Sequence, residues 1–399
     1  MTAPLAFPPG FLWGATTAAH AVEGGSPPSD WWIWEQVPGR VADGTTSRLG
    51  AGWWERADED FVAAARLGLT ALRFSVEWSR VEPDQGRFDE AALARYAAWA
   101  ERLRALGLEP VVCLLHGTLP AWLAARGGFR RPEAVERFAR FADRVAVGLS
   151  DRVRWWLTVD DPAGLVRRGL LDGTAPPGRR DFAAALASAR HLAQAHAAAY
   201  RVIHRRVEGA LVSAGVQVTP RPPADPGSLL SRGAAWLHDW LENRAWLEST
   251  LEGRLRPPLG ALTRLGDGRC THDFIGVQAE GDALAGAALE LSRHGRPLLV
   301  SSHGLPGREP GPLLASLAGL HRAIRAGADV RGYLHRSLVD GFEFGAGHTQ
   351  PAGLLEVDRA SQARTLSPRG VALGEVARGQ GGPAARGPPG RIAPADPPC

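Results

Sequence analysis

The sequence predicts an α/β protein built as a single (β/α)8 TIM barrel, and three observations support this prediction. Short apolar runs alternate with amphipathic helical patterns from about residue 10 to about residue 340. Eight of these runs have the length of a strand and lack strict polar–apolar alternation, as expected of parallel strands covered on both faces. No G-x-G-x-x-G follows the first run and no P-loop is present, which argues against a doubly wound open sheet.

The eight predicted strands are rich in β-branched, leucine or aromatic residues. In chain order they are residues 11–16, 71–76, 110–115, 153–159, 210–216, 274–277, 297–300 and 330–334. Helical patterns lie between them, at residues 58–67, 90–106, 132–149, 182–205 and 312–325. The first two patterns stop at Gly68 and Gly107, as helices often end at a glycine in the C′ position.

Composition and length place the chain among globular proteins with one large domain. Of its 399 residues, 45% are hydrophobic and 22% are charged. The net charge is only +4, and the basic residues are spread along the chain. Nucleic-acid binding would require basic residues clustered on one face, so no nucleic-acid partner is expected. We predict a barrel domain over residues 1–378 and a disordered tail rich in Gly, Pro, Ala and Arg over residues 379–399.

Cysteine content and the chain's beginning predict a cytoplasmic protein. Cys113, Cys270 and Cys399 do not form a disulfide framework, and Cys113 lies in an apolar run typical of a core position. The first residues lack the basic and apolar regions of a signal peptide. No apolar stretch approaches the length of a membrane span, so no membrane partner is expected.

Several segments resemble the signature segments of glycoside hydrolase family 1, the β-glucosidase family. They are FPPGFLWGATTAAH at 7–20, ALRFSVEWSRVEP at 71–83, LHGTLP at 115–120, APPG at 175–178, DFIGV at 273–277, and RGY followed by SLVDGFEF within 331–344. They follow the family order from about residue 7 to about residue 375. The resemblance implies a (β/α)8 barrel and, in the family, hydrolysis of β-glycosides with retention of configuration.

The resemblance also places the two catalytic glutamates of the family, and neither is present. The sequence LTVDDP at 157–162 puts Asp161 at the acid/base position, and LVSSHG at 299–304 puts Ser302 at the nucleophile position. A retaining mechanism needs two carboxyl groups about 5–5.5 Å apart. A serine hydroxyl needs a base, and the adjacent His303 is expected to point to the opposite face of its strand. We therefore expect that ordinary retaining hydrolysis is lost, with Ser302 either a small filler or a weak catalytic group.

Asp160 and Arg73 add charge near these positions. Two adjacent carboxylates should raise the pKa of one of them, which would keep a proton available for acid catalysis, unless an arginine pairs with one of them. In the family, the arginine aligned with Arg73 holds the nucleophile carboxylate, which is absent here. Because a buried cation needs a partner, we expect Arg73 either to pair with Asp160 or to face an anionic ligand.

The sugar-binding positions implied by the resemblance are partly altered. His116 and Glu343 are kept, Gln278 and Arg336 replace an asparagine and a tryptophan, and Gly117 and Phe344 replace other aromatic residues of the family. The predicted binding residues are His116, Asp160, Glu343, Arg73, Gln278 and Arg336. The expected ligand is a small molecule, either a glycoside or an anionic compound.

Three functions remain open on the sequence alone. The first is a β-glucosidase-like protein by lineage, deficient in retaining hydrolysis. The second is a barrel repurposed for another acid/base or transfer reaction in small-molecule biosynthesis, and the third is a non-catalytic protein that binds a glycoside or a partner. No cofactor or metal is predicted, because the alternative metal set of His116, His303, Asp160, Asp161 and Glu343 has no local spacing signature.

Overall fold

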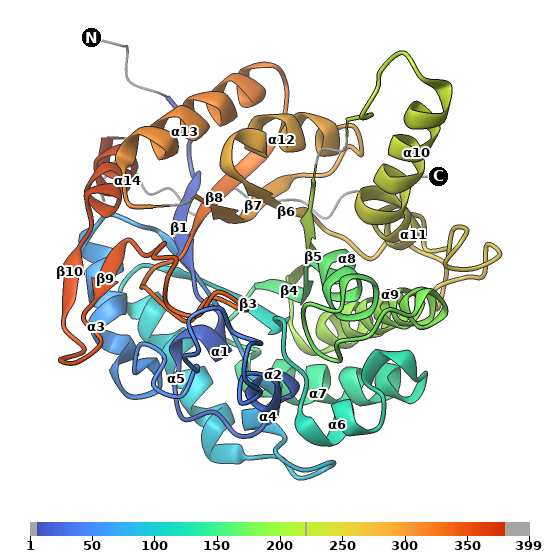
Figure 1. The fold of residues 1–399 in the computed structure, drawn as a ribbon. Helices are drawn as coiled ribbons and strands as arrows, with labels where there is room; N and C mark the ends of the chain where they lie inside the picture. Colours follow the sequence, from blue (N-terminus) through green and yellow to red (C-terminus); the bar gives the residue numbers. More distant parts are fainter. Residues whose placement is uncertain (1–5, 220–221, 306, 380–399) are drawn as a thin grey trace.

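The protein forms a closed barrel of eight parallel strands surrounded by helices (Figure 1), which confirms the predicted fold class. The computed structural model describes residues 6–219, 222–305 and 307–379. The strands follow one another around the barrel in chain order, and β8 closes it against β1. They are β1 Leu12–Thr16, β2 Ala71–Ser75, β3 Glu109–Leu115, β4 Trp155–Asp160, β5 Leu211–Gln217, β6 Ile275–Glu280, β7 Leu298–Gly304 and β8 Val330–Arg336.

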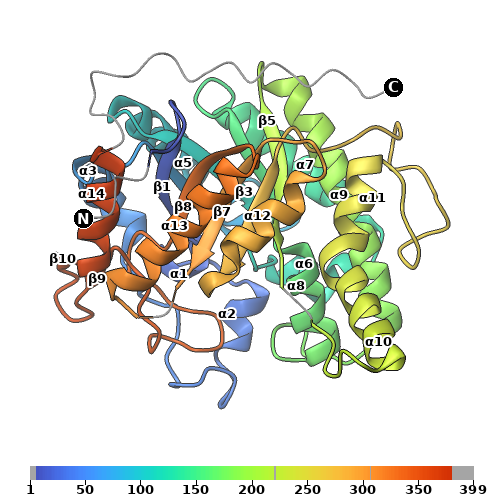
Figure 2. The same ribbon diagram turned by 90° about the horizontal axis from the view of Figure 1, so that it is seen from above.

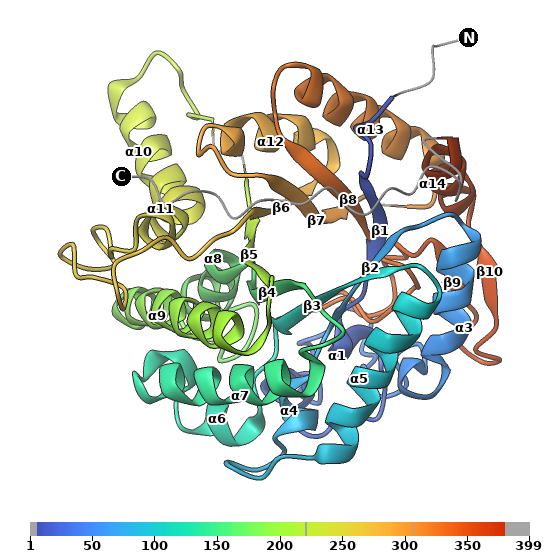
Figure 3. The same ribbon diagram turned by 180° about the vertical axis from the view of Figure 1, so that it is seen from behind.

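Long helices form the outer ring, which is also seen from behind in Figure 3. They are α3 Trp53–Arg66, α5 Glu90–Ala105, α7 Glu133–Leu149, α9 Phe182–Arg206, α10 Leu229–Asp239, α11 Ala245–Glu252, α12 Leu284–Ser292, α13 Pro310–Arg325 and α14 Pro368–Gly379. Shorter helices lie in the connections: α1 Ala19–Val22, α2 Asp30–Trp34, α4 Trp78–Val81, α6 Ala121–Ala125, α8 Pro162–Val166, η1 Gly128–Arg130, η2 Arg167–Asp172, η3 Trp240–Arg244 and η4 Gly281–Ala283. A two-stranded antiparallel ribbon, β9 Leu355–Val357 and β10 Arg364–Leu366, precedes α14.

Sequence signals fix the ends of several of these helices. Asp89 and Asp181 cap α5 and α9, because each carboxylate accepts a hydrogen bond from the backbone N–H three residues later. Gly68 and Gly107 adopt the left-handed conformation after α3 and α5, with φ of 82° and 75°. The predicted glycine stops are thus confirmed.

The core has two parts, one inside the barrel and one between barrel and helices. The inner cluster joins residues from the starts of the strands, including Trp155, Leu157, Phe274 and Cys113. Cys113 is fully buried, as predicted, and burial raises the pKa of its thiol to about 12. This cluster fills the lower part of the barrel, so only the upper part, at the carboxyl ends of the strands, is left for a polar cavity.

The predicted strands are confirmed, but five of them continue further at their carboxyl ends. β4 extends to Asp160, β5 to Gln217, β6 to Glu280, β7 to Gly304 and β8 to Arg336. These last residues are mostly polar, because they line a cavity rather than the core, so no apolar run marks them. The predicted tail at 379–399 lies outside the described residues apart from Gly379. Within the described ranges, no helix is both long and apolar enough to cross a membrane.

Candidate active site

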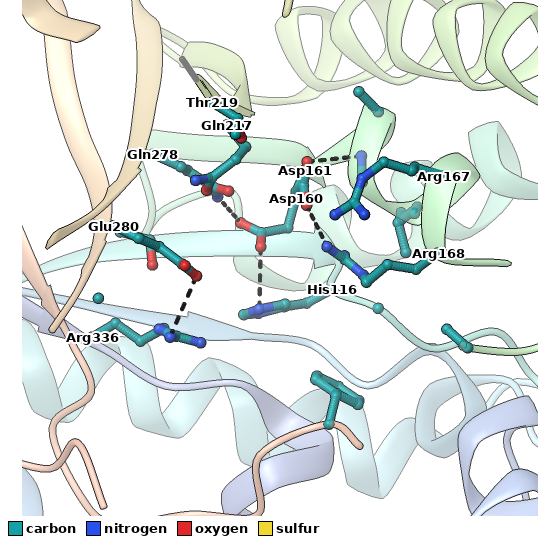
Figure 4. A pocket seen from close by; sticks show the side chains of 18 of the residues that line it. His116, Asp160, Asp161, Arg167, Arg168, Gln217, Thr219, Gln278, Glu280 and Arg336 are labelled. Atoms are coloured by element: carbon teal, nitrogen blue, oxygen red, sulfur yellow. Dashed lines mark hydrogen bonds and ion pairs between the residues drawn. The ribbon is translucent and has the colours of Figure 1, made fainter. Parts of the chain in front are cut away.

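A cavity of about 390 Å³ lies at the carboxyl ends of the barrel strands. Side chains from all strands between β3 and β8, or from the turns directly after them, line it (Figure 4). They include His116, Asp160, Asp161, Gln217, Gln278, Glu280, Ser302 and Arg336, together with Glu343 from the loop after β8. Functional groups of TIM barrels are found at this end of the barrel. Seven of the eight residues predicted for the site therefore line one cavity.

Arg73, the eighth predicted residue, lies at the cavity floor and is fully buried. Its Nη2 forms an ion pair with Oδ1 of Asp160, and its Nη1 donates a hydrogen bond to the backbone oxygen of Ser301 at 2.9 Å. Of the two expected environments for Arg73, the structure shows the pair with Asp160. A buried guanidinium is tolerated because this carboxylate neutralises it.

Asp160 is held by three neighbours. Besides Arg73, Gln278 donates a hydrogen bond to its Oδ1, and His116 Nε2 lies 3.2 Å from its Oδ2. Burial alone would raise the pKa of Asp160, but the charge of Arg73 and the bonds from its neighbours outweigh burial, so the pKa is lowered. Burial lowers the pKa of His116 to about 4, although Asp160 opposes this shift. The site floor thus carries an ionised Asp160 beside a neutral His116 near pH 7.

Asp161 starts helix α8 rather than pointing a free carboxyl into the cavity. Its backbone has a φ of 45°, and its Oδ1 accepts a hydrogen bond of 2.9 Å from the N–H of Gly164. Its Oδ2 accepts one of 2.9 Å from Arg168 Nη1, so each oxygen has a donor (Figure 4). The pKa of Asp161 is raised; the main cause is burial, and the charge of Asp160 contributes less. Both carboxyl groups also pair with an arginine, which was the predicted alternative. Aspartate suits this capping role and glutamate does not.

Replacing Asp161 with alanine is expected to lower the free energy of unfolding by about 1–2 kcal/mol, because the start of α8 loses its cap. Asp161→Asn keeps a capping oxygen and should stay within about 0.5 kcal/mol of the wild type. Urea denaturation monitored by circular dichroism measures both. Equal stability of the alanine and asparagine variants would contradict the capping role.

Ser302 and His303 lie on opposite faces of β7, as predicted. Ser302 lines the cavity, and its hydroxyl makes no hydrogen bond to another residue within the described ranges. His303 is fully buried outside the barrel, where its ring nitrogens contact the Tyr333 hydroxyl and the Gly281 oxygen, both at 2.8 Å. His303 therefore cannot act as a base for Ser302. It also lies away from the other residues of the metal set that the sequence offered as an alternative. Among the described residues, no three His, Cys, Asp or Glu side chains are grouped to hold a metal ion.

Burial of His303 predicts a dependence of stability on pH. Burial lowers its pKa from 6.5 to about 4, so the unfolded chain binds a proton in a pH range where the folded protein does not. The stability that His303 contributes is complete above pH 6.5 and is lost as the pH falls towards 4. In His303→Gln, the loss of stability between pH 6.5 and 4 should be smaller by up to about 3 kcal/mol. Melting temperatures of the wild type, this variant and the exposed control His238→Gln, measured across that range, test the expectation; matching slopes in all three would contradict it.

Arg336 crosses the mouth of the cavity. Its Nη1 lies 3.1 Å from Glu343 Oε2, and its Nη2 lies 3.7 Å from Glu280 Oε1. Gly304 makes room for it, because a Cβ at that position would lie 2.7 Å from Arg336 Nη2. Glu343, predicted as a retained sugar contact, is therefore ion-paired with the residue that replaces the family's tryptophan.

Sequence reasoning missed a second group of cavity residues. Arg167 and Arg168 come from η2, and Glu242 and Asn243 come from η3. Arg167 lies 2.5 Å from Asp172 and 3.6 Å from Glu242, so it too is paired. One signal in the sequence could have found Arg168. It follows Asp161 by seven residues, which is two helical turns and places both on one face of a helix.

Comparisons with known proteins agree with this geometry. A family model described as glycosyl hydrolase family 1 matches residues 4–260 and 314–378. Thermostable beta-glucosidase B of Thermobispora bispora is 31% identical over 434 residues, which cover 92% of this chain and 89% of that protein. A beta-galactosidase of Sulfolobus acidocaldarius is 27% identical and covers 95% of this chain and 96% of its own. The solved structure of a beta-glycosidase from Pyrococcus horikoshii superposes with a TM-score of 0.87 at 29% identity, covering 95% and 96% of the two chains.

The segment between the two matched parts, residues 261–313, contains β6 and β7. Gln278, Glu280 and Ser302 therefore lie in the part of the chain that the family model does not match.

Proposed function

The chain belongs to glycosyl hydrolase family 1, and from this membership we propose that it binds a glycoside at the mouth of its barrel without hydrolysing it by the retaining mechanism. Its relatives include a β-glucosidase and a β-galactosidase, so the proposed ligand class is a β-glucoside or β-galactoside. The protein would then be a family member that keeps the scaffold and the pocket but not the ordinary reaction.

The proposal depends on which side chains occupy the two catalytic positions, 302 and 161, and on the bonds that they make. Retaining hydrolysis needs a carboxylate to attack the anomeric carbon and a carboxylic acid to protonate the leaving oxygen. Ser302 offers a neutral hydroxyl, and the adjacent His303 bonds to Tyr333 and Gly281 instead of to Ser302. Asp161 accepts a hydrogen bond on each oxygen, from Gly164 and Arg168, and both bonds favour the ionised carboxylate over the acid that would protonate a leaving group.

The charges of the cavity support a neutral ligand over an anionic one. Each arginine that lines the cavity or lies at its floor has a carboxylate partner: Arg73 with Asp160, Arg167 with Asp172, Arg168 with Asp161, and Arg336 with Glu343. An anion would have to compete with these carboxylates for the guanidinium groups. Sugar hydroxyls, in contrast, can bond to the neutral His116, to Gln278 and to Gln217 without displacing a charge.

Two further proposals concern the chain as a whole. We propose that residues 1–378 act as one barrel domain, since the strands from β1 to β8 close a single barrel. We also propose that the protein works in the cytoplasm, which is supported by Cys113 and Cys270, both free thiols.

The proposal is tested with 2,4-dinitrophenyl β-glucoside, whose leaving group departs without a proton. The wild type is expected to give no turnover above that of heat-denatured protein in plain buffer. Sodium azide should produce α-glucosyl azide, because azide can enter the space beside Ser302 and attack from the face that a nucleophilic carboxylate would occupy. The anomeric configuration is read by NMR.

Control measurements separate loss of chemistry from loss of binding. Saturation-transfer NMR with methyl β-glucoside should show binding to the wild type. Turnover of the aryl glucoside by the wild type in plain buffer, above that of heat-denatured protein, would overturn the proposed loss of hydrolysis. Absence of binding of both β-glucoside and β-galactoside would overturn the proposed ligand class.

A further inference from the structure

A second cavity of about 340 Å³ lies beside the candidate active site and differs from it in chemistry. It is enclosed by α2, α6, η1, α8, η2 and α9, at the end of the barrel where Figure 2 shows α2, α6 and α8. Its walls are mainly apolar, with Leu119, Phe129, Val166, Leu170 and Leu192 among the lining residues. We call this cavity the apolar chamber. Its volume lies in the range of small-molecule sites.

The apolar chamber borders the polar cavity at Gly117, Leu165 and Pro176, which line both. Gly117 contributes no side chain to the wall between them. A Cβ there would lie 3.1 Å from the ring of Phe344, and the backbone φ of 86° disfavours any other residue. On the outer side, Ile33 and Val37 are 50% and 46% exposed, so the rim of the chamber is apolar as well.

Two buried polar atoms in the chamber walls have no hydrogen-bond partner among the described residues. They are the Ser188 hydroxyl, in a residue only 3% exposed, and Nε1 of Trp34. Burying a polar group without a partner is unfavourable, and most such groups in folded proteins are satisfied. A ligand with one hydroxyl could accept a hydrogen bond from either atom or donate one to Ser188. Asp30 and Arg130 also line the chamber, and the other walls would favour an apolar body.

We propose that the apolar chamber is a second ligand site, for a small apolar molecule that carries a single hydroxyl group. The apolar body packs against Phe129, Leu170 and Leu192, and the hydroxyl bonds to Ser188. This site does not depend on the proposed binding of glycosides, because none of the residues that carry it takes part in the charge pairs of the polar cavity.

Equilibrium dialysis with 2-naphthol and naphthalene tests the site, since these probes share a ring system and differ by one hydroxyl. The wild type should bind 2-naphthol more tightly. Ala124→Phe, which adds a ring to the chamber from the half-buried position 124 of α6, should weaken binding of both probes at least tenfold. Ser188→Ala should weaken binding of 2-naphthol about five- to tenfold and leave naphthalene unchanged.

Two matched variants serve as controls. Ala98→Phe adds the same ring on the exposed face of α5, and Ser316→Ala removes a buried hydroxyl that is already bonded to Gly281. Neither should change binding. Failure of 2-naphthol to bind, or equal binding to the wild type and Ala124→Phe, would overturn the proposal. If Ala124→Phe does not fold, equal affinities of the wild type and Ser188→Ala for 2-naphthol would overturn it instead. Neither probe contains a sugar, so these results are independent of the glycoside assays.

Discussion

Replacing Asp160 with alanine is expected to lower the free energy of unfolding by about 3–5 kcal/mol. The substitution leaves Arg73, which is fully buried, without its carboxylate partner. It also removes the acceptor for Gln278 and the group beside His116. The net value of a buried ion pair is small, but an unpaired buried charge is strongly unfavourable. Urea denaturation, with the free energy extrapolated to water, measures the loss.

Two controls identify its cause. Replacing both partners, Arg73→Met with Asp160→Leu, should recover most of the stability, because no charge is then buried alone. Asp84→Ala removes one partner of an exposed pair with Arg87 and should change stability by less than about 1 kcal/mol. A loss below about 1 kcal/mol in Asp160→Ala would show that water or another group reaches Arg73.

Replacing Ser302 with glutamate is expected to raise the rate of 2,4-dinitrophenyl β-glucoside hydrolysis on the order of 10²- to 10³-fold above the background given by the wild type. The substitution supplies a nucleophile and a negative charge facing the developing positive charge of the sugar ring. Arg73 lies close enough to orient the new carboxylate, since its Nη1 already reaches the backbone of Ser301. Initial rates at low substrate concentration measure the change.

Substrates with different leaving groups distinguish the role of position 302 from that of position 161. Dinitrophenolate needs no proton, whereas an alkyl β-glucoside does, so Ser302→Glu should leave the alkyl glucoside uncleaved because Asp161 remains bonded to Gly164 and Arg168. Ser302→Gln matches glutamate in size without its charge and should remain at background. Equal rates of the Glu and Gln variants would contradict the assignment of Ser302 to the nucleophile position.

The fold was predictable from the sequence because its signals are local and repeated. Apolar runs marked the eight strands, and Gly68 and Gly107 marked the ends of two helices. The carboxyl ends of the strands were underestimated, because residues such as Asp160 and Glu280 face a polar cavity and interrupt the apolar pattern. The region of α10, α11 and α12 was not predicted either, because these helices have only 11, 8 and 9 residues and offer few turns in which a helical period can be recognised.

Seven residues that line the cavity were predicted from the resemblance, whereas their pairing and the residues from η2 and η3 were not. Asp161 pairs with Arg168, and Glu343 pairs with Arg336. Both pairs depend on side chains from separate turns that meet only in the folded protein. The pairing of Arg73 with Asp160 was among the expected alternatives because a buried cation restricts the choices. No such restriction applied to Arg168, which is partly exposed.

The carboxyl group of Asp161 caps helix α8, and the same two oxygens would have to carry the proton in acid catalysis. Lengthening this side chain to glutamate would free a proton donor, but it would also leave the N–H of Gly164 without its acceptor and move the charge away from Arg168. Gain of acid catalysis by this single change is therefore opposed by the loss of the helix cap. A further substitution that caps α8 in another way would offset that loss.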